Sequence, residues 1–105
     1  MLLQPTTIYH VAQKADWHQA ALSSLYFPAS FDQEGFIHCS TSEQVEGVLE
    51  RYFQNQCVLK LTIEVAMLVH PPKYERAVSA NQLFPHIYGP INIEAVIAIE
   101  EIGYG

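Results

Sequence analysis

The spacing of apolar residues switches between two and about 3.6 positions along the chain, which predicts short strands mixed with two main helices. β-Branched or alternating runs predict strands at residues 7–11, 36–40, 57–65, 74–78 and 93–102. Helical spacing predicts one helix at residues 14–25 and a second that follows the helix-capping signals of residues 40–44 and ends near Gln54. Residues 26–35 and 84–90 contain proline and glycine and are predicted to be loops.

Two of these elements indicate how the core is built. The second helix has one apolar stripe, which is expected to face the core and consists of Val45, Val48, Leu49, Tyr52 and Phe53. Residues 57–65 alternate between apolar and polar side chains, as a half-exposed antiparallel strand does. The chain therefore predicts an α+β fold in a single domain of residues 1–105, with a small, mostly antiparallel sheet and two helices packed on it.

The charge balance excludes one class of partner. The chain has 105 residues, five Lys and Arg side chains, eleven Asp and Glu side chains, and a formal net charge of −6. Proteins that bind double-stranded nucleic acid cluster basic side chains against the phosphates, whereas the five here are scattered and suit one phosphate at most. No signal peptide, membrane-spanning run or CxxC pair is found, so we expect a cytoplasmic protein with two reduced thiols and no membrane partner.

Histidines supply the candidate chemistry. His18 is expected on a helix surface and His70 in a loop. His10 and His38 lie within predicted strands that are otherwise apolar, and His86 lies in a predicted loop with a proline on each side. A buried imidazole needs a hydrogen-bond partner, so each of His10, His38 and His86 taken alone is explained by packing. Taken together with their polar neighbours, they predict a shared small-molecule cleft. Its candidate residues are His10, His38, Ser40, Thr41, His86 and Tyr88.

Other patterns of catalysis and metal binding are missing from the sequence. No HxH, HExxH or paired-cysteine spacing is present, so we expect no metal site. Cys39 points away from His38 on a strand and is expected in the core. Glu34 and Glu75 lie in or beside loops without the spacing of a paired-carboxylate motif, and the chain contains neither a glycine-rich phosphate loop nor GxSxG.

Two segments resemble a known family. The sequences EGFIHCS, from Glu34 to Ser40, and FPHIYGP, from Phe84 to Pro90, resemble the small bacterial family called domain of unknown function 952. The resemblance extends over most of the chain and includes the IYHV segment around His10 and the tryptophan at Trp17. That family is similar to the ADP-ribosyltransferase fold, which implies a split β-sheet and a cleft that holds NAD in its working relatives.

The resemblance also implies roles for individual residues. It places His10 on the first strand, where the family's relatives hold the NAD ribose, and Ser40-Thr41-Ser42 resembles the segment that shapes the nicotinamide end. The hydroxyls are equally explained as a helix N-cap, a position that also attracts anions. The third motif of these enzymes is a glutamate, and the sequence identifies no counterpart for it.

Three functions are compatible with these observations. In an enzyme of the ADP-ribosyl type, acting on NAD or on an ADP-ribosylated or phosphorylated substrate, His38 and His86 are the acid/base candidates, because imidazole titrates near neutral pH. Ser40 and Thr41 would bind phosphate or amide oxygens, and Tyr88 would contact a ring. The alternatives are a non-catalytic small-molecule binding module and a protein-interaction domain in which residues 57–65 form an edge strand.

Overall fold

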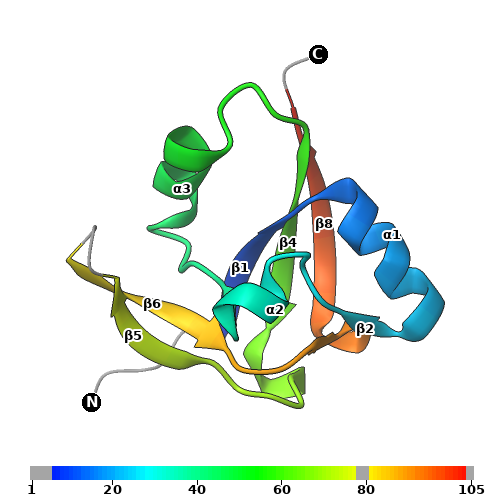
Figure 1. Ribbon diagram of the computed structural model, residues 1–105. Coiled ribbons are helices and arrows are strands. Elements are labelled where there is room, and N and C mark those ends of the chain that lie inside the picture. Colours follow the sequence, from blue (N-terminus) through cyan, green and yellow to red (C-terminus); the bar gives the residue numbers. More distant parts are fainter. Residues whose placement is uncertain (1–5, 78–80, 104–105) are drawn as a thin grey trace.

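The computed structural model describes residues 6–77 and 81–103 (Figure 1). The strands are β1 (Thr7–Ala12), β2 (Leu25–Tyr26), β3 (Ile37–His38), β4 (Val58–Glu64), β5 (Lys73–Ala77), β6 (Gln82–Ile87), β7 (Ile91–Asn92) and β8 (Val96–Ile102). The α-helices are α1 (Lys14–Ser23), α2 (Phe31–Glu34) and α3 (Val45–Tyr52), and two 3₁₀ turns are η1 (Val65–Met67) and η2 (Ile93–Ala95). The paired strands are antiparallel and form three small sheets with the orders β1-β4-β8, β3-β6-β5 and β2-β7. The predicted α+β class, with antiparallel strands in split sheets and two main helices, is confirmed.

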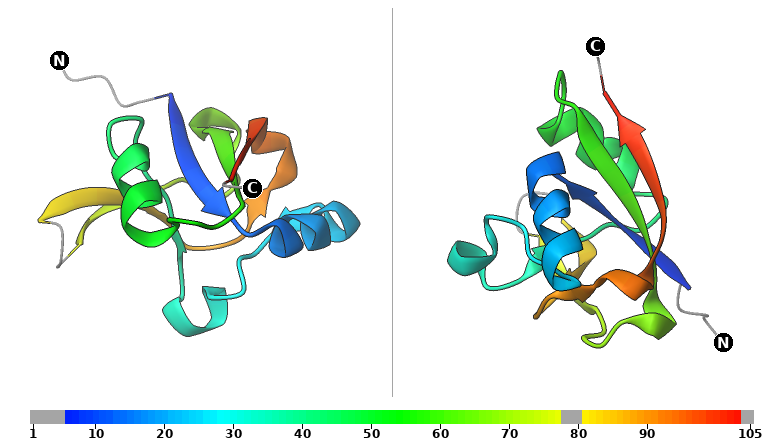
Figure 2. Two further views of the ribbon diagram at one scale, coloured as in Figure 1. Left: turned by 90° about the horizontal axis from the view of Figure 1, so that it is seen from above. Right: turned by 90° about the vertical axis from the view of Figure 1, so that its right-hand side faces the viewer.

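One backbone junction links the two three-stranded sheets. The N–H of Tyr9 donates to the carbonyl of Ser40 over 2.8 Å, and the N–H of Ser40 donates back to Tyr9 over 2.7 Å. This is an isolated bridge rather than a ladder, because β3 has already ended and the chain turns away after Ser40 into α3. The sheets therefore diverge from this point, and α1 and α3 lie on opposite sides of β1 (Figures 1 and 2).

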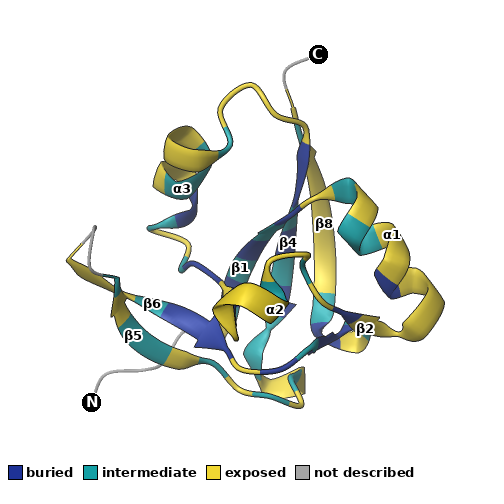
Figure 3. Ribbon diagram, viewed as in Figure 1, coloured by how far each residue is buried: buried dark blue, intermediate teal, exposed yellow. Residues whose placement is uncertain are grey.

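The core fills the space between the sheets. Its side chains come from all three sheets, and the largest that are fully buried are Ile8, Tyr26, Ile37, Val58, Leu61, Ile63, Pro85, Ile87 and Ile91. Figure 3 shows this buried centre, with most of α1, α2 and β8 exposed around it. Burying such apolar surface is the main force that holds a domain of this size together.

The prediction that residues 84–90 form a loop is wrong for residues 84–87, because residues 82–87 form β6, in the middle of the sheet β3-β6-β5. Residues 88–90 belong to no helix or strand, as predicted. Proline in a central strand normally removes a ladder hydrogen bond. Here the Pro85 carbonyl accepts the N–H of Cys39 over 3.0 Å, but Pro85 has no N–H to return to the Cys39 carbonyl. The pairing of β3 with β6 therefore ends at His38 and His86.

Other element boundaries also differ from the prediction. The first helix ends at Ser23 because Ser24 adopts a left-handed conformation with φ of 67°, and the supposed loop at 26–35 contains part of β2 and the short α2. The predicted strand at 36–40 is paired only at Ile37 and His38, apart from the single bridge at Ser40. Residues 93–102 begin with η2 before β8 starts. The strand at 74–78 is present as β5, and its predicted end, Val78, lies outside the described residues.

The alternating strand is not at an edge. β4 pairs with β1 on one side and β8 on the other, so the suggestion of an edge strand at 57–65 is wrong. Its polar face is half-exposed as predicted, and there Lys60 Nζ lies 3.2 Å from Glu100 and 5.6 Å from the centre of the Tyr9 ring. The edge strands of this sheet are β1 and β8, and much of β8 remains exposed.

The second helix packs less tightly than its apolar stripe predicts. Val45 is buried, Val48 and Leu49 are half-buried, and Tyr52 is 56% exposed. The helix begins at Val45, and no hydroxyl of residues 40–42 caps it. Instead the side-chain Oε1 of Gln44 accepts the N–H of Thr41 over 3.0 Å, so the predicted hydroxyl cap is wrong.

Candidate functional site

A cleft of about 720 Å³ opens where the two sheets diverge. α3 forms one wall, the exposed side of β6 forms the facing wall, and residues 28–30 after β2 close one end. Gln44 links the two walls, because its amide donates to the carbonyl of Leu83 over 2.8 Å and to the side chain of Gln82 over 3.2 Å. The position of α3 relative to β6 is thereby fixed by side-chain hydrogen bonds.

His38 and His86 lie directly opposite each other on neighbouring strands. β3 and β6 pair in a register that matches His38 with His86, so both side chains project from the same face of the sheet. Their ring centres are 5.2 Å apart at an interplanar angle of 79°. The side chain of His38 is 55% exposed and that of His86 only 8%. The predicted acid/base residues are therefore brought together at the cleft.

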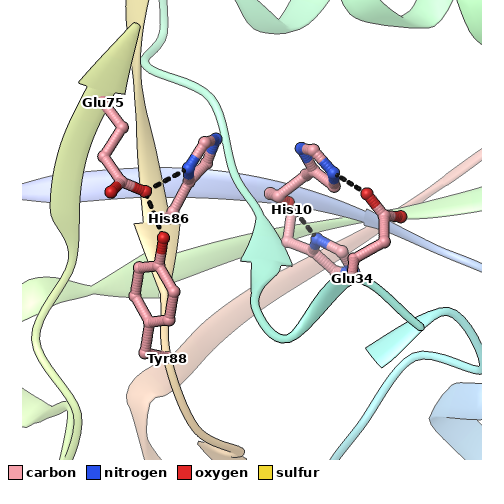
Figure 4. A network of polar contacts seen from close by, with 6 residues as sticks. His10, Glu34, Glu75, His86 and Tyr88 are labelled. Atoms are coloured by element: carbon pink, nitrogen blue, oxygen red, sulfur yellow. Dashed lines mark hydrogen bonds and ion pairs between the residues drawn. The ribbon is translucent and has the colours of Figure 1, made fainter. Parts of the chain in front are cut away.

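Each of these imidazoles is bonded to its own glutamate. Nε2 of His38 lies 2.5 Å from the Glu34 carboxylate, and Nδ1 of His86 lies 2.8 Å from the Glu75 carboxylate (Figure 4). A carboxylate accepts hydrogen bonds only, so each bonded ring nitrogen carries the proton. The other ring nitrogen, Nδ1 of His38 and Nε2 of His86, is left as a base when the ring is neutral.

Glu75 holds a second donor as well. The Tyr88 hydroxyl donates to the same carboxylate oxygen, Oε1, over 2.5 Å. These two hydrogen bonds, from Tyr88 first and His86 second, keep the pKa of the Glu75 carboxyl below its usual value. The same carboxylate raises the pKa of the Tyr88 hydroxyl. Glu75 is thus held as an anion that fixes the orientation of both rings.

An aromatic ring supports the two histidines. Phe36 stacks on His86 with ring centres 4.2 Å apart and an interplanar angle of 24°. It meets His38 edge-on at 4.7 Å and Tyr88 at 5.3 Å. A stacked ring restricts rotation of the imidazole without using either ring nitrogen, so the nitrogens stay available for polar contacts.

His10 lies behind the pair and is buried. Its Nδ1 is 2.6 Å from the carbonyl of His38 and its Nε2 is 2.8 Å from the hydroxyl of Tyr26. Burial lowers the pKa of His10 to about 4, so the ring is neutral at pH 7. Because a carbonyl can only accept, Nδ1 carries the proton and the Tyr26 hydroxyl donates to Nε2. His10 thus fixes the backbone at His38, and an ordinary ligand contact through Nε2 would have to replace Tyr26.

Of the remaining predicted site residues, Ser40 lines the cleft, whereas Thr41 and Tyr88 do not. Ser40 is buried at the cleft, and no hydrogen bond joins its hydroxyl to another of the described residues. Thr41 does not line the cleft, and neither does Tyr88, which reaches the site through Glu75. Cys39 is buried in the core as predicted, and burial raises the pKa of its thiol.

Three residues of the site had no assigned role from the sequence. Glu34 lies four residues before His38, and Gly35 between them ends α2 with φ of 80°. A glycine at this position predicts a turn, and that turn brings Glu34 close to His38, so the sequence contained a local signal for this contact. Glu75 has no such signal, because it meets His86 only through the pairing of β5 with β6. Tyr26, the partner of His10, was likewise hidden in a predicted loop.

Within residues 6–77 and 81–103, no three His, Cys, Asp or Glu side chains converge as metal ligands do. None of the helices in that part of the chain is both long and apolar enough to cross a membrane.

Comparison with known proteins places the chain in a family. Residues 11–99 match the family described as protein of unknown function (DUF952). The crystal structure of protein CC0527 from Caulobacter crescentus is similar with a TM-score of 0.84 and 26% sequence identity, covering 95% of this chain and 89% of that one. The solution NMR structure of CC0527 gives a TM-score of 0.78 and 26% identity over 96% of this chain and 88% of that one. The search of curated proteins gave no match. The family match covers most of the sequence, and this chain therefore belongs to the DUF952 family.

Proposed function

We propose that this protein is a cytoplasmic enzyme with a nucleotide-type cleft, in which His38 and His86 form an acid/base pair. The proposed substrate is NAD or a compound with an ADP-ribosyl or phosphate group. The observation that carries the proposal is the direct cross-strand pairing of the two imidazoles, with 5.2 Å between ring centres, each bonded to its own glutamate.

The arrangement suits a reaction that moves two protons. A group transfer is accelerated when one side chain takes a proton from the attacking group and another gives one to the leaving group. Glu34 and Glu75 each fix the ring nitrogen that carries the proton, and a glutamate beside an imidazolium stabilises its charge. His38 and His86 therefore offer two oriented nitrogens to one substrate.

The remaining predicted residues take supporting parts in the proposal. The hydroxyl of Ser40, at the cleft, binds a phosphate or amide oxygen. Tyr88 does not line the cleft and takes part through its hydrogen bond to Glu75, so a ring contact between Tyr88 and a ligand stays a prediction. His10 acts as a positioning residue, because both its nitrogens are already bonded. Thr41 stays a candidate only if α3 moves, since its side chain does not line the cleft.

The test combines binding and turnover. Thermal-shift assays with NAD, ADP-ribose and NADP identify a ligand, which raises the melting temperature if it binds the folded state alone. Labelled ligand is then used to compare the wild type with His38→Gln and His86→Gln. We expect both variants to retain the thermal shift and to lose turnover by about 100-fold or more, the usual contribution of an acid/base group.

The matched control is His18→Gln, which changes an exposed histidine on α1 that does not line the cleft. It should turn over substrate at the wild-type rate. Wild-type turnover by both His38→Gln and His86→Gln would rule out the acid/base pair. The absence of a thermal shift with every nucleotide would contradict the nucleotide-type cleft.

A non-catalytic binding module is the second candidate. The carboxylates beside the pair, Glu34 and Glu75, are both bonded to imidazoles, so neither is free to orient an acceptor as the third-motif glutamate of ADP-ribosyltransferases does. A protein that binds NAD or ADP-ribose through this cleft and yields no product in the turnover assay would support the module over the enzyme.

A protein-interaction role is favoured by a different feature. Ile97 is 53% exposed and Ile99 48% exposed on β8, an edge strand of its sheet. An edge strand with exposed apolar side chains is a surface on which a strand of another protein chain can pair. Sedimentation of the wild type against Ile99→Lys tests this candidate, because a dimer built on β8 would dissociate in the variant.

A further inference from the structure

We infer that Arg51, on the wall of the cleft opposite the histidines, anchors the anionic group of a ligand that carries one negative charge on an apolar or aromatic body. The inference rests on the proposed function only in placing the reacting end of the ligand at His38 and His86. Among the substrates proposed above it favours NAD, whose net charge is one negative, over ADP-ribose and NADP, which carry more negative charge. No role was assigned to Arg51 from the sequence.

The other four basic side chains are already engaged. Lys14 lies 3.0 Å from Glu101, Lys60 lies 3.2 Å from Glu100 and Lys73 lies 3.8 Å from Glu75. Arg76 donates to the side chain of Asn81 over 2.6 Å. Within the described part of the chain, Arg51 has neither an ion pair nor a side-chain hydrogen bond, and it is the basic residue that lines the cleft.

The surroundings of Arg51 define the rest of the ligand. Arg51 lies in the last turn of α3, where Val48, Tyr52 and Phe53 also line the cleft. Tyr52 is 56% exposed, although an aromatic side chain gains stability from burial. Phe84 lines the facing wall next to His86. A ligand with its anion at Arg51 would therefore lay an apolar or planar body between aromatic walls, with its far end at the histidines.

The balance of charge limits the anion to one negative charge. Three carboxylates, Asp16, Glu34 and Glu43, line the same cleft. Asp16 accepts the N–H of Ala29 over 3.1 Å and Glu34 is bonded to His38, but both keep their charge. One guanidinium compensates one anionic group, and each further negative charge on the ligand meets repulsion from these carboxylates.

Guanidinium binds both a phosphodiester and a carboxylate through paired N–H groups. Cyclic AMP and 1-naphthoate represent these two sources of a single negative charge on an aromatic body. Adenosine and 1-naphthamide are their uncharged counterparts, and AMP adds a second charge. Calorimetry measures the affinity of each probe for the wild type, Arg51→Gln, Arg51→Lys and the control Arg76→Gln, while the ¹⁵Nε resonance of Arg51 reports direct contact.

We expect at least one singly charged probe to shift the Arg51 resonance and to bind about tenfold more weakly to Arg51→Gln, as loss of a charged hydrogen bond predicts. Arg51→Lys should restore part of the affinity and Arg76→Gln should match the wild type. The affinity for the uncharged probes should not change, and AMP should bind more weakly than cyclic AMP. Equal affinity in Arg51→Gln and the wild type, or no response of the Arg51 resonance to either anion, would overturn the inference.

These outcomes are separate from those of the turnover assay. Binding that depends on Arg51, with no turnover that depends on the histidines, would keep the anion anchor and reject the acid/base function. Turnover that depends on the histidines but not on Arg51 would reject the anchor alone. Thermal melting of Arg51→Gln verifies folding, because a basic side chain in the last turn of a helix also stabilises the helix dipole.

Discussion

Protonation of His10 has a cost that follows directly from its environment. Burial lowers the pKa of His10 from 6.5 to about 4. The hydrogen bond to the His38 carbonyl raises the pKa but is outweighed by burial. The charge of His38 lowers the pKa further, and the charge of Asp16 raises it. In the unfolded chain the ring binds a proton near pH 6.5, whereas in the folded chain it does so only near pH 4. Stability is therefore lost as the pH falls between these two values.

The size of the loss follows from the difference between the two pKa values. At about 1.4 kcal/mol per pH unit, the wild type should lose about 3 kcal/mol between pH 7 and pH 4 through His10 alone. That is a large part of the roughly 5–15 kcal/mol that stabilises an average domain.

The variant His10→Asn isolates this contribution. Its amide nitrogen can still donate to the His38 carbonyl, but it does not titrate and it leaves the buried Tyr26 hydroxyl without its acceptor. We expect the variant to be less stable than the wild type at pH 7 by about 1–3 kcal/mol, the usual cost of an unpaired buried polar group. At pH 4 that difference should have vanished or reversed, because only the wild type has lost the His10 contribution.

Urea unfolding at pH 7, 6, 5 and 4 measures the free energy of unfolding of both proteins, and equal slopes against urea confirm that they unfold alike. Other groups, such as Glu75, also reduce the free energy of unfolding at low pH. Their contribution is the same in both proteins and cancels when the two free energies are subtracted. His18→Asn, at an exposed position of α1, provides the control and should differ from the wild type by the same small amount throughout. A difference between wild type and His10→Asn that stays constant from pH 7 to pH 4 would refute the reasoning.

Two further predictions concern the core and a tight contact. Cys57 is exposed and Cys39 buried, so a thiol reagent should label one cysteine per folded chain quickly and the second only after unfolding; two fast thiols would contradict the buried site. Gly89→Ala places a methyl group 2.6 Å from the ring of His70 and should destabilise the protein by about 1–3 kcal/mol. Urea unfolding of Gly89→Ala in a His70→Ala background should show most of that loss recovered, and an unchanged loss would exclude this contact as the cause.

Local sequence determined the type of most elements and the most informative residues. β-Branched and aromatic residues at 7–11 were sufficient to predict β1, and alternation at 57–65 was sufficient to predict β4, because side chains along a strand alternate between faces whatever the strand pairs with. His38 was identified because an imidazole in an apolar strand needs a hydrogen-bond partner, and His86 because it lies between two prolines. The family resemblance of the two motifs is confirmed by the match over residues 11–99.

Tertiary structure decided what those residues do together. His38 faces His86 only because β3 pairs with β6 in one register, and Glu75 reaches His86 only because β5 pairs with β6. The same pairing turned the proline-containing segment around Pro85 into a central strand, against its local preference. β4 became central rather than an edge through its pairing with β8. Side-chain periodicity is a local property of the chain, whereas strand order and register depend on contacts between distant residues, which no local pattern encodes.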